Sequence, residues 1–225
     1  MKPHFSLIWL SIAFSCVACS GGANDSRAQV GVATGIDHPY FPLQPGSHRT
    51  YEGDAEGVLR RDEVFVLEQQ EIVDGVACVA VRQEKYLADV LQEITVEWYA
   101  TDASGNVWKY GEQGQERTPG GEFERVPDSW RSGEEGMQPA LAMPALLDVG
   151  TAFVMPRGDG TDEYVVAATG VSAVVPAGVF GGCVEMHENP QDPVDADIVL
   201  YAPGVGPVSE TSQTGRIWLV QDRRR

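Results

Sequence analysis

The sequence lacks the short motifs that mark common enzyme active sites. It contains no G-x-S-x-G elbow, no H-E-x-x-H zinc pair, no Walker phosphate loop and no dinucleotide fingerprint. The glycine pairs Gly158-Asp159-Gly160 and Gly204-Val205-Gly206 lie in predicted turns, and no helix is expected to begin after them. The sequence therefore names no catalytic residue and favours a non-catalytic protein.

Positive charge is also scarce. The chain has 16 Lys and Arg against 33 Asp and Glu, and its formal net charge is −17. Such an acidic body repels phosphate backbones and anionic membrane surfaces, because the electrostatic contribution to such binding has the wrong sign. Nucleic acid is excluded as a partner, and the acidity is explained by the solubility of an exported protein.

One long apolar run is present, from Phe5 to Ala18, and it follows Lys2. Its roughly 14 residues fall short of the roughly 20 that a membrane-spanning helix needs, which disfavours an uncleaved anchor. Small residues precede Cys19 and Ser-Gly-Gly follows it, as in a bacterial lipoprotein signal. We predict that residues 1–18 are removed and Cys19 is lipidated; cleavage of a plain secretory signal is the alternative.

The predicted mature chain has three parts: the lipidated Cys19, a small, polar tether through residue 36, and a single β domain over residues 37–225. Ser20 stands where aspartate often retains lipoproteins at an inner membrane. The predicted location is the bacterial cell envelope, with a lipid anchor in the outer membrane if the host has one.

Few cysteines remain after this processing, namely Cys78 and Cys183. An exported protein with two cysteines is a candidate for one disulfide, so we predict a Cys78–Cys183 bond. Two buried free thiols are the alternative.

Period-two alternation broken by glycine turns dominates the rest, and no long helix is predicted. Residues 94–100 place Ile94, Val96 and Trp98 on one face, and residues 102–106 turn the chain into the next strand. Residues 111–136 are rich in Gly and Glu and predict a surface excursion; Pro139 and Pro144 favour an extended segment over 137–147. The predicted fold class is mainly β, with a single antiparallel, strongly curved sheet or open barrel.

Five short pieces, in their order and spacing, carry a resemblance to a known family. They are Tyr40-Phe41-Pro42-Leu43 with Gly46 and Tyr51; Trp98-Tyr99-Ala100 with Asp102; Gly105-Asn106-Val107-Trp108 with Gly111 and Glu112; Val175-Pro176-Ala177-Gly178-Val179-Phe180 with Cys183; and Tyr201-Ala202-Pro203-Gly204-Val205-Gly206. On these pieces the mature chain resembles a family of uncharacterised bacterial exported proteins and lipoproteins. It departs from that pattern at Arg49-Thr50-Tyr51, where a tryptophan more often precedes the strand.

The resemblance implies a mainly β exported domain and no established activity. The last two pieces also resemble periplasmic proteins of the lipoprotein-carrier fold, an open barrel that holds acyl chains. That likeness concerns the fold, and a fold does not choose a function.

Polar residues flank both cysteines. Strand alternation places Glu185 and His187 on the face of Cys183, and Arg82 and Glu84 on the side of Cys78. If the cysteines bond, these four residues form one binding patch, which His38 or His48 would convert into a metal site. The alternative is an ordinary solvated sheet face.

No cofactor is expected. Asp159, Asp162, Asp192, Asp195 and Asp197 offer oxygen ligands for calcium, but the alternating-aspartate loop with a central glycine is absent. Prolines at 190 and 193 favour an acidic turn, and a calcium site is the alternative.

These observations predict a cell-envelope lipoprotein that acts as a non-catalytic binding module for a hydrophobic or amphipathic ligand, such as a lipid, or for an envelope protein. The alternatives are an envelope hydrolase that uses carboxylates and a structural interaction module. A large apolar cavity favours ligand binding, whereas a cleft with two converging carboxylates of raised pKa favours hydrolysis.

Overall fold

The computed structural model describes residues 35–157 and 160–224. The predicted signal segment, Cys19 and nearly all of the predicted tether lie outside this range. The described part is built from strands and connecting turns, without a helix, and its strands form one antiparallel sheet. Consequently, no described helix is long and apolar enough to cross a membrane. The predicted fold class is confirmed.

The strands have the following bounds: β1 His48–Ala55, β2 Val58–Val73, β3 Val76–Leu87, β4 Val90–Thr101, β5 Val107–Arg117, β6 Phe123–Arg125, β7 Trp130–Arg131, β8 Ala140–Met143, β9 Ala152–Arg157, β10 Gly160–Val175, β11 Gly178–Glu188, β12 Asp197–Ala202, β13 Gly206–Thr211 and β14 Gly215–Arg223.

Strand order follows the chain with one exception. The path through the sheet is β6-β5-β4-β3-β2-β1-β14-β13-β12-β11-β10-β9, and β7 and β8 pair with β5 beside this path. The pairing of β1 with β14 joins the first strand of the chain to the last. The sheet therefore has an N-terminal half, β2–β5, and a C-terminal half, β10–β13.

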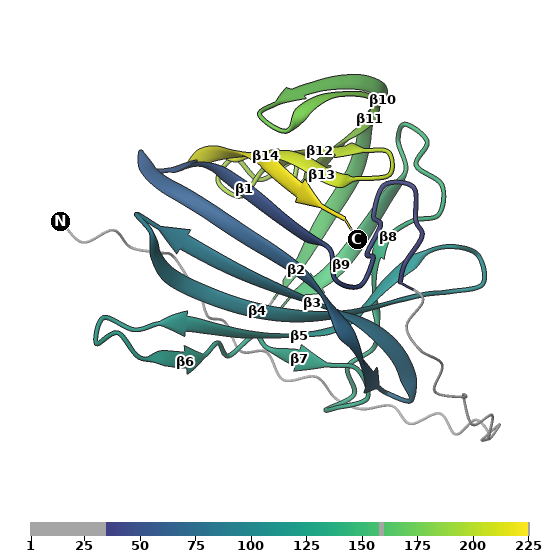
Figure 1. Ribbon diagram of the computed structural model, residues 1–225. Coiled ribbons are helices and arrows are strands. Elements are labelled where there is room, and N and C mark those ends of the chain that lie inside the picture. Colours follow the sequence, from purple (N-terminus) through teal and green to yellow (C-terminus); the bar gives the residue numbers. More distant parts are fainter. Residues whose placement is uncertain (1–34, 158–159, 225) are drawn as a thin grey trace.

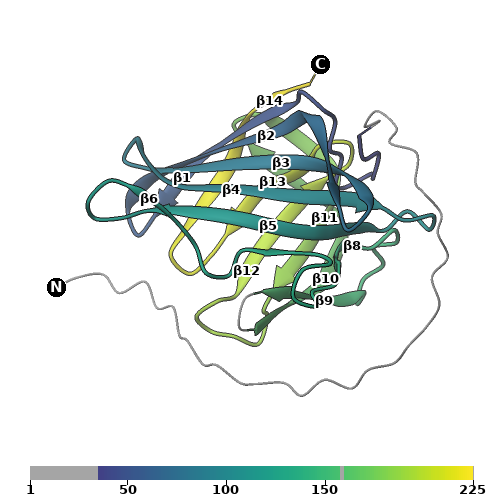
Figure 2. The same ribbon diagram turned by 90° about the horizontal axis from the view of Figure 1, so that it is seen from below.

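The sheet bends so strongly that its halves face each other. In Figures 1 and 2 the long strands β2–β5 form one layer, and β10–β13 cross behind them as a second layer. The largest core cluster draws on both layers, with Val81 and Tyr99 from one half and Val166, Val184 and Met186 from the other. The sheet must curve to bury these apolar side chains, because a flat sheet would leave its apolar face exposed to water.

Two glycines allow the close approach at the joint between the halves. A Cβ atom added to Gly53 would lie 1.8 Å from the carbonyl oxygen of Arg216, and one added to Gly215 would lie 2.0 Å from that of Asp54. Both distances are far below van der Waals contact. Glycine at these two positions therefore allows the backbones of β1 and β14 to lie close together where the two layers meet.

The two cysteines lie in different core clusters. Cys78 packs with Val73, Ala80 and Trp98, whereas Cys183 packs with Ala173, Val208 and Leu219 in a cluster of the C-terminal half. Both cysteines are buried and free. The predicted disulfide is therefore wrong for this structure. Strands β3 and β11 are not neighbours in the sheet, and each thiol fills a separate apolar cluster.

Two segment boundaries also differ from expectation. Strand β5 continues to Arg117, into the predicted surface excursion, because its backbone pairs with β4 as far as Glu116. Ile36, assigned to the tether, is only 2% exposed and bridges to Leu43. The folded body thus begins before residue 37. Residues 137–147 are extended as predicted, with β8 at their centre.

The motif pieces of the sequence analysis have structural roles. The Asp102 carboxylate accepts hydrogen bonds from the amide of Asn106 and from the indole of Trp108, at 3.0 and 2.8 Å, and so shapes the β4–β5 turn. The N-terminal piece packs against the β12–β13 turn, where the amide of Gly204 donates to the carbonyl of Pro39 at 2.6 Å. These contacts give the pieces a role in folding.

Candidate functional site

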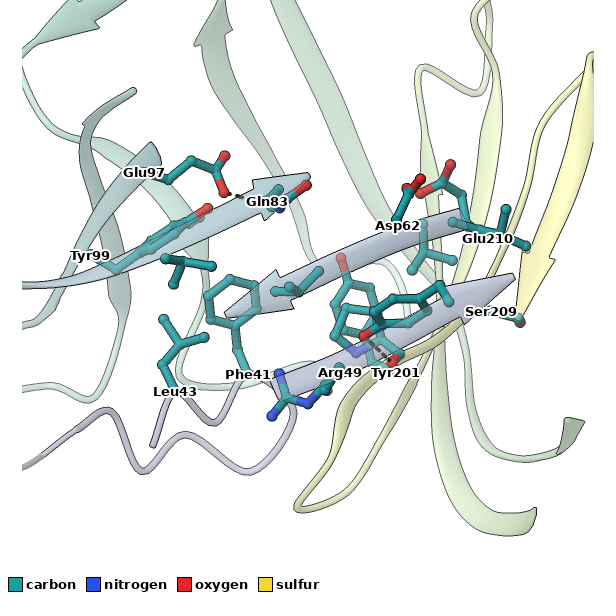
Figure 3. Close-up of a pocket in the computed structure, with 18 of the residues that line it drawn as sticks. Phe41, Leu43, Arg49, Asp62, Gln83, Glu97, Tyr99, Tyr201, Ser209 and Glu210 are labelled. Carbon is teal, nitrogen blue, oxygen red and sulfur yellow. Dashed lines mark hydrogen bonds between the residues drawn. The ribbon is translucent and has the colours of Figure 1, made fainter. Parts of the chain in front are cut away.

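The two layers leave a hollow between them. It has a volume of about 290 Å³, and residues of both halves and of the N-terminal segment line it. Figure 3 shows Glu97 and Tyr99 on one side and Tyr201, Ser209 and Glu210 on the other. We call this space the hollow. Its size is near the lower end of the range for small-molecule sites.

The wall of the hollow is largely apolar and aromatic. Its aliphatic part includes Leu43, Val64, Val81, Val199 and Ile217. Its aromatic residues are Phe41, Tyr51, Tyr99, Tyr164 and Tyr201. The rings offer large contact areas, and the tyrosines add polar tips. Such a lining suits a ligand that is apolar over most of its surface.

The hollow also contains charged groups, and its two arginines are already engaged. Arg60 lies 2.6 Å from Asp62 and 3.3 Å from Glu210, so it bridges two strands of opposite layers. Figure 3 shows the carboxylates of Asp62 and Glu210 side by side. The guanidinium of Arg49 donates to the carbonyl of Pro42 at 3.0 Å and lies 3.5 Å from Asp222. Arg60 therefore has two carboxylate partners, whereas the Nε of Arg49 is buried without a hydrogen-bond partner.

Glu188 is the ionisable group of the hollow with the weakest compensation. No described arginine or lysine pairs with it. Burial, together with the negative charges of Asp162, Asp197 and Glu210, raises the pKa of its carboxyl to about 7, although a hydrogen bond with Tyr164 acts in the opposite direction. Near neutral pH this carboxyl exchanges its proton readily.

Asp197 lies opposite Glu188 in the β11–β12 ladder. Burial raises the pKa of Asp197 to about 6, with further contributions from Glu210 and Asp195, while Arg60 partly opposes the shift. Burial also raises the pKa of Tyr51 to about 12 and that of Tyr201 still further, so both phenols stay protonated. Of the two carboxyl groups with raised pKa values, Glu188 lines the hollow, and Asp197 is its ladder partner on β12.

A second cavity of about 180 Å³ adjoins the hollow and shares Gln83 and Glu97 with it. We call it the acidic groove, because its lining includes five carboxylates: Glu93, Glu97, Glu112, Glu116 and Asp128. Most are neutralised. The ammonium of Lys109 binds Glu97 at 2.7 Å and also binds Glu112, and that of Lys85 lies 2.7 Å from Glu93.

The predicted patch of four polar residues is divided in the structure. Arg82 pairs with Glu84 at 2.6 Å on β3, and His187 pairs with Glu185 at 2.8 Å on β11. Five strands separate β3 from β11 along the sheet, namely β2, β1, β14, β13 and β12. The four residues do not form one site, because the disulfide that was to join them is absent.

The histidines and aspartates considered as metal ligands have other partners. His38 is buried, with its Nε2 3.1 Å from the carbonyl of Pro144, and His48 pairs with Glu63 on another strand. Asp192 accepts hydrogen bonds from the amides of Val194 and Asp195, as in an acidic turn. Asp159 lies outside the described residues. Within the described chain, no group of three or more His, Cys, Asp or Glu residues is arranged to hold a metal ion.

The sequence analysis missed the carboxyl groups of the hollow. Glu188 follows Val184 and Met186 on the buried face of its strand, and Asp62 precedes Val64 and Val66 in the same way. A carboxylate two residues from an inward-facing aliphatic side chain was the available signal. This signal does not reveal which distant strands form the opposite wall of the hollow.

Comparison with known proteins yields little. No protein-family model matches the chain, and no curated protein matches it. A crystal structure from Bacteroides fragilis, of a protein described as exported and as having a YmcC-like fold, aligns with a TM-score of 0.42 and 15% identity. The alignment covers 83% of this chain and 100% of that one. At this level of similarity the family resemblance stays a prediction.

Proposed function

We propose that the protein is a cell-envelope lipoprotein that binds a small amphipathic molecule in the hollow. The supporting observation is the composition of its wall, in which aromatic and aliphatic side chains surround a carboxyl group without a cationic partner. A concave, mostly apolar space with a few convergent polar groups is the usual form of a ligand site.

The volume of the hollow sets the size of the ligand. A space of about 290 Å³ is near the lower end of the range for small-molecule sites and favours a ligand with a single short chain or one ring system. The proposed ligand is therefore smaller than the cargo that the lipoprotein-carrier resemblance implied.

The test is native mass spectrometry of the protein isolated from its own envelope. We expect a bound small molecule, and we expect Ala142→Trp, which fills the hollow, to lose it. Ala177→Trp, at the exposed tip of the β10–β11 hairpin, is the control and should retain it. A wild-type protein without bound mass, or a mass retained by both variants, would argue against ligand binding in the hollow.

The lipid anchor has a separate test. With Cys19→Ala, we expect the protein to move from the membrane fraction to the soluble fraction of the envelope, because no thiol is then available for lipidation. The wild-type protein should carry an N-terminal lipid mass. Identical fractionation of both proteins would contradict the proposed anchor.

Hydrolysis is the second candidate function, favoured by the raised pKa values of Glu188 and Asp197. A carboxyl with a pKa near 7 is suited to act as a general acid at neutral pH. The test is a panel of chromogenic glycosides and esters, read as a function of pH. Turnover that Glu188→Gln abolishes while the protein stays folded supports this candidate, and no turnover on any substrate argues against it.

A further inference from the structure

The charges of the hollow do not balance. Its lining contains two cations, Arg49 and Arg60, and four carboxylates, Asp62, Glu97, Glu188 and Glu210. Arg60 is shared between Asp62 and Glu210, and Arg49 is held by Pro42 and Asp222. Glu97 is bound by Lys109. Glu188 is thus left lining the hollow without a described arginine or lysine as its partner.

Three carboxylates raise the pKa of the Glu188 carboxyl. Asp162 and Tyr164 lie on β10, Asp197 on β12 and Glu210 on β13, and Arg60 on β2 binds Asp62 and Glu210. An anionic ligand group beside Glu188 would be repelled by these carboxylates, and a neutral group would leave the imbalance as it is. A positive ligand group would offset it.

The aromatic residues of the wall also favour a positively charged ligand, independently of the carboxylates. Three cation–π pairs are present among the described residues: Arg61 on Tyr86, Arg131 on Trp98 and Arg216 on Trp218. None of these three rings lines the hollow. The tyrosine rings of the hollow therefore carry no described guanidinium. Ring faces of this kind attract organic cations, and most strongly where water is excluded.

We infer that the ligand of the hollow is a small organic cation, an amine or quaternary ammonium with an apolar body. Its charge lies beside Glu188, and its apolar part lies against Val81, Val199 and the tyrosine rings. A bare metal ion does not fit, because the described residues contain no group of three metal ligands and the wall is apolar. This inference rests on the proposed function and names the class of its ligand.

Three probes with the same six-carbon tail test the inference: hexyltrimethylammonium, hexyl sulfate and 1-hexanol. Titration calorimetry of the full mature chain at pH 8 and low salt measures each affinity. We expect hexyltrimethylammonium to bind at least tenfold more tightly than hexyl sulfate, with 1-hexanol between them. Equal affinities would overturn the inference while leaving an amphipathic site in place. If no probe binds, the proposed function fails as well.

Two matched variants on β11 test whether the positive charge of the ligand lies beside Glu188. Glu188→Gln should reduce the affinity for hexyltrimethylammonium about five- to tenfold and leave that for 1-hexanol unchanged. Glu185→Gln changes the same functional group on the opposite face of the strand, where Glu185 pairs with His187, and should change neither affinity. Equal losses in both variants would overturn the assignment to Glu188.

The wild-type protein provides a test that needs no variant. If the cation binds beside Glu188, its affinity should rise about five- to tenfold from pH 6 to pH 8, as that carboxyl ionises, while the affinity for 1-hexanol stays constant. A cation affinity that is independent of pH would contradict the inference even if Glu188→Gln failed to fold.

Discussion

The hollow and the acidic groove lie on the same inner face of one sheet and share two residues. They differ in how their carboxylates are paired with cations. In the groove, Lys109 and Lys85 bind three of the five carboxylates, and none of the lining residues is aromatic. In the hollow, five aromatic residues line the same space as a glutamate that no described arginine or lysine binds. The groove thus compensates most of its carboxylates within the fold, whereas the hollow leaves Glu188 without a described arginine or lysine, and we assign the proposed ligand to that position.

The largest expected effect comes from removing the groove's central cation. Lys109→Met leaves Glu97 and Glu112 buried without it, and we expect a loss of about 3–5 kcal/mol of unfolding free energy. The side chain of Lys109 is 9% exposed, whereas that of Lys85 is 37% exposed. Lys85→Met should therefore cost about 1 kcal/mol or less. Urea unfolding measures both, and equal losses would remove the distinction between the two lysines.

The next effect concerns the pH dependence of stability. Because the folded-state pKa of Glu188 is about 7, above its ordinary 4.5, its contribution to stability is fully present below pH 4.5 and is lost as the pH rises through 7. Glu188→Gln should remove this loss, which is on the order of 2 kcal/mol between pH 5 and pH 8. A smaller decline from Asp197 should remain.

Urea unfolding at a series of pH values checks this prediction. Glu185→Gln should follow the wild-type curve, because its carboxylate lies outside the hollow. A Glu188→Gln curve parallel to that of the wild type would show that Glu188 does not carry the raised pKa.

A smaller effect is expected when a cation is removed from the hollow, which increases the difference in charge compensation between the hollow and the groove. Arg60→Gln leaves Asp62 and Glu210 without their shared cation, so we expect a loss of about 1–2 kcal/mol of stability. The affinity for hexyltrimethylammonium should rise severalfold, because the negative charge of the hollow increases. The control is Arg61→Gln, which removes a cation that binds Glu63 and stacks on Tyr86 instead. A lower cation affinity in Arg60→Gln would contradict the proposed charge balance.

The smallest effect is expected where no charge is involved. Burial raises the pKa of the Cys78 thiol to about 12 and also raises that of Cys183, so neither should react with an alkylating agent in the folded protein. Both should be alkylated after unfolding without a reductant, as peptide mass spectrometry would show. Dithiothreitol should leave the unfolding midpoint unchanged. A disulfide over this loop would instead contribute about 4–5 kcal/mol.

Much of the fold could be predicted because strand formation is local. The alternation of residues 94–100 and the extended character of 137–147 depend on side chains a few positions apart, and the structure agrees with both. The continuation of β5 to Arg117 was missed, because its Gly and Glu composition suggests a loop until β4 is present as a pairing partner. The disulfide was predicted wrongly for a related reason, since the number of cysteines says nothing about which strands are neighbours.

The sequence by itself determined the class of the fold, the acidity of the body and the two faces of each strand. Those properties follow from composition and from a two-residue period. Only the tertiary structure decided that Glu188, Asp62, Glu210 and Tyr201 line one space, because the curvature of the sheet brings strands from opposite halves together. It also decided which carboxylates are neutralised, since an ion pair depends on distances across strands that the order of residues does not contain.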